Sequence, residues 1–180
     1  MFIQTELTPN PETLKFLPNR TVNEGEPVNF TKSEDYSISP LATALFNIKD
    51  VRGVFLGSDF ITITKEPEAS FELMKPEILM TMMDHFVANI PVLLQNKQAA
   101  SNENDSEIVK QIKELIETRV RPAVAQDGGD IIFESFENGI LRLQLHGACS
   151  GCPSSAVTLK DGIENMLKYY VPEIESVEAV

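Results

Sequence analysis

A polar stretch near the middle of the chain limits what the chain can fold into. Residues 95–106 read QNKQAASNENDS and contain no aromatic or β-branched residue, and no apolar residue beyond two alanines. Such a stretch has no side chain to contribute to a core, so we expect it to be a flexible linker. The sequence therefore predicts two small domains, residues 1–94 and 107–180, joined by the linker 95–106.

The first domain has a mixed pattern of strand and helix signals. Ser39-Pro40 is typical of a helix start, because proline is tolerated at the first helical position. Ser70 is expected to cap a longer helix, within which Pro76 marks a kink or a new helix start. Four segments rich in apolar and β-branched residues are expected to form strands, the last two of them a hairpin: 2–7, 13–17, 51–56 and 60–65.

The second domain has a clearer order of elements. Apolar residues at helical spacing predict a helix over 107–120, and Gln126 to Asp130 is expected to be a turn. Two strands flank Asn138-Gly139, a pair that suits the positive φ angles of a tight hairpin turn. A helix beginning at Pro153 and a last strand complete the order α-β-β-α-β. The fold class is therefore α+β, with two small α+β domains.

The charge of the chain excludes some classes of partner. The formal net charge is −12: residues 1–94 carry 7 Lys/Arg and 13 Asp/Glu, residues 101–180 carry 7 and 14, and Lys97 adds +1. No basic block is present to neutralise phosphates, so we expect no nucleic acid partner. No apolar run is long enough to cross a bilayer, so we expect no membrane partner.

The N-terminal residues also bear on location. Met1 to Asn10 lack the basic start and the apolar core of a secretory signal peptide. We therefore expect a cytoplasmic protein, as in bacteria, or a mitochondrial matrix protein whose presequence has been removed.

The chain has two cysteines, Cys149 and Cys152, in one Cys-x-x-Cys motif. The surrounding sequence GACSGCP lies between a predicted strand and a predicted helix. Gly147 and Gly151 allow tight turns and a close approach to a bulky group. Pro153 fits the first position of the helix, whose positive end favours thiolates and anions held by them. These thiols are expected to be metal or cluster ligands, or redox groups, and not structural disulfides.

Two thiols cannot complete a site that needs four ligands. A two-fold dimer that apposes two identical loops supplies four thiolates, which favours a metal group shared between two chains. The motif alone does not choose between a [4Fe–4S] cluster, a [2Fe–2S] cluster and zinc. A thiol–disulfide oxidoreductase that uses Cys149 and Cys152 also stays open, although no thioredoxin-like βαβ pattern surrounds the motif.

Several other polar residues are candidates for a role near this motif. His146 ends a strand on its polar face and is a candidate neighbour of the bound group. Asp127 and Asp130 flank two glycines, but two carboxylates alone make a poor metal cage, so a turn is the better interpretation. Arg119 and Arg121 are candidates to pair with these acids or to contact a partner protein. No catalytic triad, phosphate loop or acid/base pair is visible, so we do not expect an enzyme.

Residues 107–180 resemble the C-terminal domain of the NifU-like (Nfu) iron–sulfur scaffold proteins. The resemblance lies in IETRVRPAVAQDGGDI (116–131), LHGACSGCPSS (145–155) and VTLKDGIENML (157–167). The first domain is similar to the N-terminal domain of that family over residues 2–18, 39–65 and 75–86. Two departures fall in the first domain, where Asn19 replaces an expected Gly and Phe71 an expected Trp.

The resemblance implies a specific function. It implies that Cys149 and Cys152 bind a [4Fe–4S] cluster between two protomers, so that the cluster-bound protein is a homodimer. It further implies that the cluster comes from upstream cluster assembly proteins and is passed to apo iron–sulfur client proteins, such as enzymes of the lipoyl synthase kind.

Overall fold

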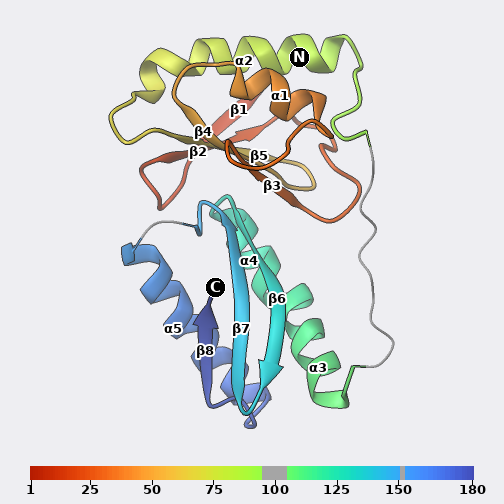
Figure 1. Ribbon diagram of the computed structural model, residues 1–180, viewed down its shortest axis with the longest axis vertical. Coiled ribbons are helices and arrows are strands. Elements are labelled where there is room, and N and C mark those ends of the chain that lie inside the picture. Colours follow the sequence, from red (N-terminus) through yellow and green to blue (C-terminus); the bar gives the residue numbers. More distant parts are fainter. Residues whose placement is uncertain (95–104, 151–152) are drawn as a thin grey trace. The chain divides into compact units, whose positions relative to one another are not determined.

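A computed structural model of the chain describes residues 1–94, 105–150 and 153–180, without the side chains of 153–156 and 158 (Figure 1). The chain separates into two compact units, Met1–Ala99 and Ala100–Val180. Both units combine helices with a sheet, so the predicted α+β class is confirmed. The predicted linker 95–106 lies almost wholly outside the described residues, and its bounds stay a prediction.

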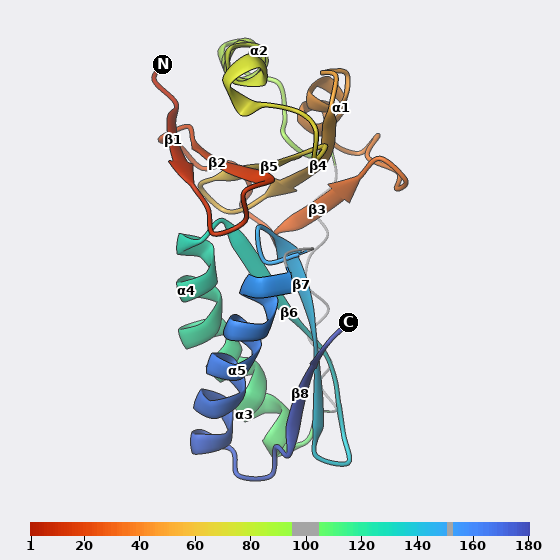
Figure 2. The same ribbon diagram turned by 90° about the vertical axis from the view of Figure 1, so that its left-hand side faces the viewer.

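The N-terminal unit is an antiparallel sheet with two helices. The strand order is β1-β2-β5-β4-β3, and α1 and α2 lie on one face of the sheet (Figure 2). The helices are α1 (Pro40–Phe46) and α2 (Phe71–Val87). The strands are β1 (Gln4–Leu7), β2 (Thr13–Leu17), β3 (Val28–Thr31), β4 (Val51–Leu56) and β5 (Ile61–Lys65).

Ser39 caps the start of α1 and connects it to a distant segment of the same unit. Its hydroxyl oxygen accepts a hydrogen bond from the Ala42 amide at 3.0 Å, which satisfies a free N–H of the first helical turn. The same hydroxyl donates to the Val92 carbonyl oxygen at 2.7 Å. Ser39 is fully buried, so a single side chain links the start of α1 to the segment that follows α2.

Two details of the first unit differ from the sequence-based expectation, and a third explains a departure from the family pattern. Strand β3 was not expected, since it is a short, partly polar strand at the sheet edge. Helix α2 runs through Pro76, so a new helix start there is wrong, and Ser70 is its N-cap without a side-chain hydrogen bond. Asn19 has φ 61, a left-handed conformation that glycine or asparagine adopts readily. This accounts for asparagine at a position where glycine was expected.

The C-terminal unit has three strands, with its helices on one face (Figure 2). The strand order is β6-β7-β8, in which β6 and β7 are antiparallel and β7 and β8 parallel. The elements are α3 (Glu107–Leu115), the π-helical turn η1 (Ile116–Val120), α4 (Arg121–Gln126), β6 (Gly129–Glu137), β7 (Ile140–Gly147), α5 (Pro153–Tyr170) and β8 (Ser176–Ala179).

The predicted order α-β-β-α-β is confirmed, with one extension. Helical structure continues beyond residue 120 to Gln126, because Pro122 lies in the first turn of α4, where its missing N–H is harmless. The hairpin turn also agrees with expectation, since Asn138 and Gly139 have φ 51 and 78. Among the described residues, no helix has the length and apolar character needed to span a bilayer.

Candidate functional site

Cys149 lies in the short connection between β7 and α5. The Ala148 amide donates to the Gly128 carbonyl oxygen at 3.1 Å, which ties this connection to the turn before β6. The Ser150 amide donates to the Gly147 carbonyl oxygen at 3.1 Å, and Gly147 has φ 63. The backbone around Cys149 is therefore held by the facing turn. Cys152, the second predicted ligand, lies outside the described residues, as does Gly151.

Gly129 makes room for the Cys149 sulfur. A Cβ atom at residue 129 would overlap Cys149 Sγ and would lie 2.9 Å from the His146 carbonyl oxygen. Gly129 faces Gly147 across the β6–β7 pair, so the sheet has no side chain at the place where the thiol packs. Cys149 as a whole is only 5% exposed.

The surroundings of Cys149 favour the protonated thiol. Burial, followed by the negative charges of Asp127 and Asp130, raises the pKa of Cys149 to about 12. These effects oppose the thiolate that the start of α5 was expected to favour. In this arrangement the thiol keeps its proton at neutral pH, so binding of a metal group requires that a proton be released.

Arg121 and Asp130 form a buried ion pair beside this site. Arg121 Nε donates to Asp130 Oδ1 at 2.9 Å and Arg121 Nη2 to Oδ2 at 3.0 Å, a two-pronged geometry that fits guanidinium and carboxylate. Arg121 also binds Glu117 at 2.6 Å. Burial lowers the pKa of Arg121, but Asp130 and then Glu117 outweigh this effect and raise it. Because Asp130 faces His146 in the sheet, the pair anchors the strand ends from which the Cys149 connection leaves.

The other polar residues that the sequence suggested near the cysteine motif have different surroundings in the structure. Asp130 is a buried strand residue paired with Arg121, so the expected turn ends at Gly128, which has φ 78. Arg119 pairs with neither acid in the described contacts, and its guanidinium lies 5.0 Å from the centre of the Tyr170 ring. His146 Nε2 is 3.3 Å from Gln144 Oε1.

Sequence reasoning missed the role of Gly129. The signal was present in the doubled glycine of the segment Asp127 to Asp130, which was read only as a turn. In the described part of the chain, no three His, Cys, Asp or Glu side chains lie close enough together to hold a metal ion.

Two family models match the chain, one on each unit. The model described as "Scaffold protein Nfu/NifU N terminal" matches residues 3–89, and the model described as "NifU-like domain" matches residues 112–178. Together they cover both units and the stretch that contains Cys149 and Cys152.

Curated relatives named "NFU1 iron-sulfur cluster scaffold homolog, mitochondrial" match over the whole chain. The human protein is 49% identical over 183 residues, which cover 100% of this chain and 72% of the human one. The Drosophila persimilis protein is 50% identical over 184 residues, which cover 100% of this chain and 65% of that one. The chain thus spans slightly less than two thirds of the Drosophila relative. Their designation as mitochondrial agrees with the matrix alternative expected from the sequence.

Solved structures that resemble the chain cover about half of it. A NifU-like protein from Saccharomyces cerevisiae has a TM-score of 0.49 at 24% identity, over 53% of this chain and 87% of that one. A Staphylococcus aureus protein has a TM-score of 0.41 at 27% identity, over 46% of this chain and 99% of that one. The family models and the human relative establish the class: the chain belongs to the Nfu family of iron–sulfur cluster scaffold proteins.

Proposed function

We propose that two copies of this chain hold one [4Fe–4S] cluster through Cys149 and Cys152 of each copy, and pass it to apo-proteins. Membership of the scaffold family supports an iron–sulfur cargo. The number of cysteines supports a cluster bound between two chains, because a [4Fe–4S] cluster takes four thiolates and each chain has two cysteines. The cluster is cargo in this proposal and not a resident cofactor, and no catalytic step is assigned to the chain.

The placement of Cys149 at the junction of β7 and α5 carries the proposal. The Ala148 amide ties the junction to the Gly128 carbonyl oxygen, and Ser150, next to Cys149, is exposed. We infer that loading turns the Cys149 side chain away from Gly129 towards solvent. This movement relieves the burial that keeps the thiol protonated, and so favours the thiolate that ligates iron.

Loading and transfer are ligand exchanges without a change in oxidation state. On loading, four cysteine thiols from two chains each lose a proton, form one Fe–S bond and displace one thiolate of the donor protein, which takes up a proton. On transfer, each thiol of the acceptor loses a proton, forms a bond to iron and displaces one of these thiolates, which takes up a proton. Loss of the dimer then completes the release.

We propose the partners and the role of the first unit on the same basis. Upstream cluster assembly proteins load the site, and apo iron–sulfur client proteins receive the cluster. The names of the relatives place those proteins in mitochondria, and we propose the matrix as the location for this chain. The linker 95–106 lets the domain 1–94 hold a client while the domain 107–180 delivers the cluster. A shortened linker is expected to slow transfer to an apo-client, and an unchanged transfer rate would contradict this role.

Anaerobic reconstitution tests the proposed function. The full chain is incubated with iron and sulfide, and its intact mass is measured under native conditions. We expect a dimer that carries the mass of one [4Fe–4S] unit, and cluster-free protein for the Cys149→Ser and Cys152→Ser variants. A metal-free monomer with an internal disulfide would favour the oxidoreductase instead. A colourless zinc-bound protein that loses structure on chelation would favour a zinc-stabilised module.

A further inference from the structure

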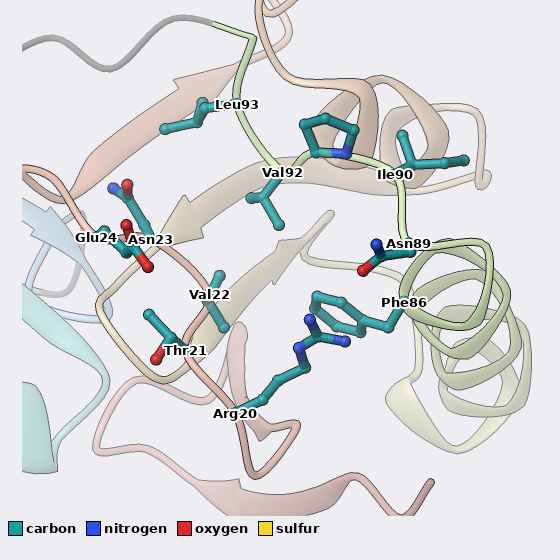
Figure 3. Close-up of a pocket in the computed structure, with 11 residues that line it drawn as sticks. Arg20, Thr21, Val22, Asn23, Glu24, Phe86, Asn89, Ile90, Val92 and Leu93 are labelled. Atoms are coloured by element: carbon teal, nitrogen blue, oxygen red, sulfur yellow. The ribbon is translucent and has the colours of Figure 1, made fainter.

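The N-terminal unit contains a pocket to which the proposed cluster chemistry gives no role. Its volume is about 490 Å³, within the range of small-ligand sites. Residues 20–24 form one wall, residues 89–93 after α2 form the other, and Phe86 lies at one end, beside Arg20 (Figure 3). Both walls are irregular backbone segments of the described chain, so the shape of the pocket depends on what holds them.

Hydrogen bonds to the rest of the unit hold both walls. The amides of Val22 and Asn23 donate to the Ser58 carbonyl oxygen at 2.8 and 3.2 Å. On the opposite side, Ser39 Oγ donates to the Val92 carbonyl oxygen at 2.7 Å, and the Leu94 amide donates to the Ile38 carbonyl oxygen at 2.8 Å. The walls are therefore built before any ligand arrives, which lowers the entropic cost of binding.

One end of the pocket presents a cation. The Arg20 guanidinium lies 5.1 Å from the centre of the Phe86 ring, and Arg20 is exposed. Within the described parts of the chain, no carboxylate forms an ion pair with Arg20. Asn89 stands beside it at the same end (Figure 3). An arginine over an aromatic ring, with no ion pair to a carboxylate in the described residues, is a candidate site for a carboxylate.

The other end of the pocket has the opposite character. Glu24 lies there, four residues along the same wall from Arg20 (Figure 3). The side-chain amide of Asn23 lies beside Glu24 and is hydrogen-bonded within the wall. Its Nδ2 donates to the Glu26 carbonyl oxygen at 2.7 Å, and its Oδ1 accepts from the Gly25 backbone amide at 3.0 Å. Val22 and Val92 line the middle. The pocket thus runs from a cation, across apolar side chains, to a carboxylate.

We propose that this pocket binds a short extended segment of a partner protein that carries an acidic side chain, then apolar residues, then a basic side chain. The acidic group is bound by Arg20 and Asn89, the apolar group packs on Val22 and Val92, and the basic group lies at Glu24. The proposal does not depend on the cluster chemistry; it rests on the client-holding role proposed for the first unit and gives that role a site.

Peptide titration of the full chain tests the proposal. The probes are acetyl-Glu-Leu-Ala-Lys-amide and the reversed acetyl-Lys-Ala-Leu-Glu-amide, because either direction of the segment meets the same charges. Backbone amide resonances of residues 20–24 and 89–93 are followed by NMR. We expect saturable shifts with at least one probe, and about a tenfold weaker affinity when its Glu is replaced by Gln, as for loss of a charged hydrogen bond.

Matched variants locate the binding. Arg20→Gln and Glu24→Gln are each expected to weaken binding about tenfold. Asn89→Gly, which keeps the left-handed backbone of Asn89 (φ 55), is expected to weaken binding less. Lys65→Gln is the control, because Lys65 also lies over an aromatic ring, that of Phe71 at 5.8 Å, but does not line the pocket. This control is expected to bind as tightly as the unchanged chain.

Three results would overturn the proposal. The first is the absence of saturable binding by both peptides at millimolar concentration, with the fold intact by circular dichroism. The second is equal affinity in the unchanged chain and in Arg20→Gln. The third is binding of free hexanoate as tightly as the peptide, which would make a small organic acid the occupant.

Discussion

Each unit has an arginine–carboxylate pair, but the pair is partly exposed in the N-terminal unit and buried in the C-terminal unit. In the N-terminal unit, Arg52 and Glu12 meet at 2.6 Å with side chains 41% and 30% exposed. In the C-terminal unit, Arg121 and Asp130 meet through two hydrogen bonds with side chains 15% and 5% exposed. Solvent screens the first pair, whereas the second leaves a buried charge behind if either partner is lost. The C-terminal unit therefore depends on polar contacts inside its fold, next to Cys149.

The largest expected effect comes from breaking the buried pair. Arg121→Gln leaves the Asp130 carboxylate buried without its main partner, and is expected to lower the free energy of unfolding of the C-terminal unit by about 3–5 kcal/mol. Arg52→Gln is the matched control and is expected to cost the N-terminal unit about 0–1 kcal/mol. Hydrogen exchange in urea, read separately for each unit, measures both values. Equal losses would mean that burial does not distinguish the two pairs.

A second prediction concerns the space beneath the thiol. Gly129→Ala places a methyl group against Cys149 Sγ, and overpacking of this kind is expected to cost about 1–3 kcal/mol. Gly162→Ala is the control, because a Cβ there meets nothing within 4 Å. In the middle of α5 this substitution is expected to stabilise the unit by about 0.5–1 kcal/mol.

Thiol reactivity provides an independent readout of the same substitution. In a Cys152→Ser background, Gly129→Ala is expected to increase the rate at which Cys149 reacts with a thiol reagent, because the displaced sulfur is more accessible. An unchanged rate together with unchanged stability would mean that Gly129 does not limit the position of Cys149.

A third prediction compares the helix caps of the two units. Ser39→Ala removes one hydroxyl from two partners, the buried Ala42 amide and the partly buried Val92 carbonyl, and is expected to cost about 1–3 kcal/mol. Ser106→Ala removes one exposed cap to the Val109 amide at 3.3 Å, and is expected to cost about 0.5–1 kcal/mol. Thermal unfolding of the two variants measures the difference. A larger loss for Ser106→Ala would contradict the importance of the bond to Val92.

The smallest expected effect is a pH dependence confined to the N-terminal unit. Burial, and to a smaller extent the charge of Arg20, lowers the pKa of His85 below its usual 6.5. The unfolded chain therefore binds a proton at this residue more readily than the folded chain. The contribution of neutral, buried His85 to the stability of the N-terminal unit is fully present above about pH 6.5 and declines as the pH falls below that value.

His85→Leu isolates this contribution, because leucine does not titrate. The variant is expected to show a flatter dependence of N-terminal stability on pH between 7 and 5, measured by hydrogen exchange. The slope for the C-terminal unit serves as the internal control and is expected to stay the same. An identical slope for the N-terminal unit with and without His85 would contradict the assigned cause.

Much of the fold could be predicted from local pattern. The strand Thr13–Leu17, the helix start at Ser39-Pro40 and the hairpin turn at Asn138-Gly139 agree with the structure because each depends on a few neighbouring residues. Strand β3 was missed because it has four residues and its pairing with β4 lies more than twenty residues away. The extension of helical structure through Pro122 was missed because proline at the start of α4 is permitted, although proline within a helix usually is not.

The candidate site shows the same division. The sequence by itself determined that Cys149 and Cys152 are the only thiols, that glycines surround them, and that a strand precedes and a helix follows them. Only the tertiary structure decided that Cys149 packs over Gly129 and that Arg121, and not Arg119, pairs with Asp130. The physical reason is range: propensity and periodicity act within a few residues, whereas burial and pairing depend on groups that the sheet and helices bring together from distant parts of the chain.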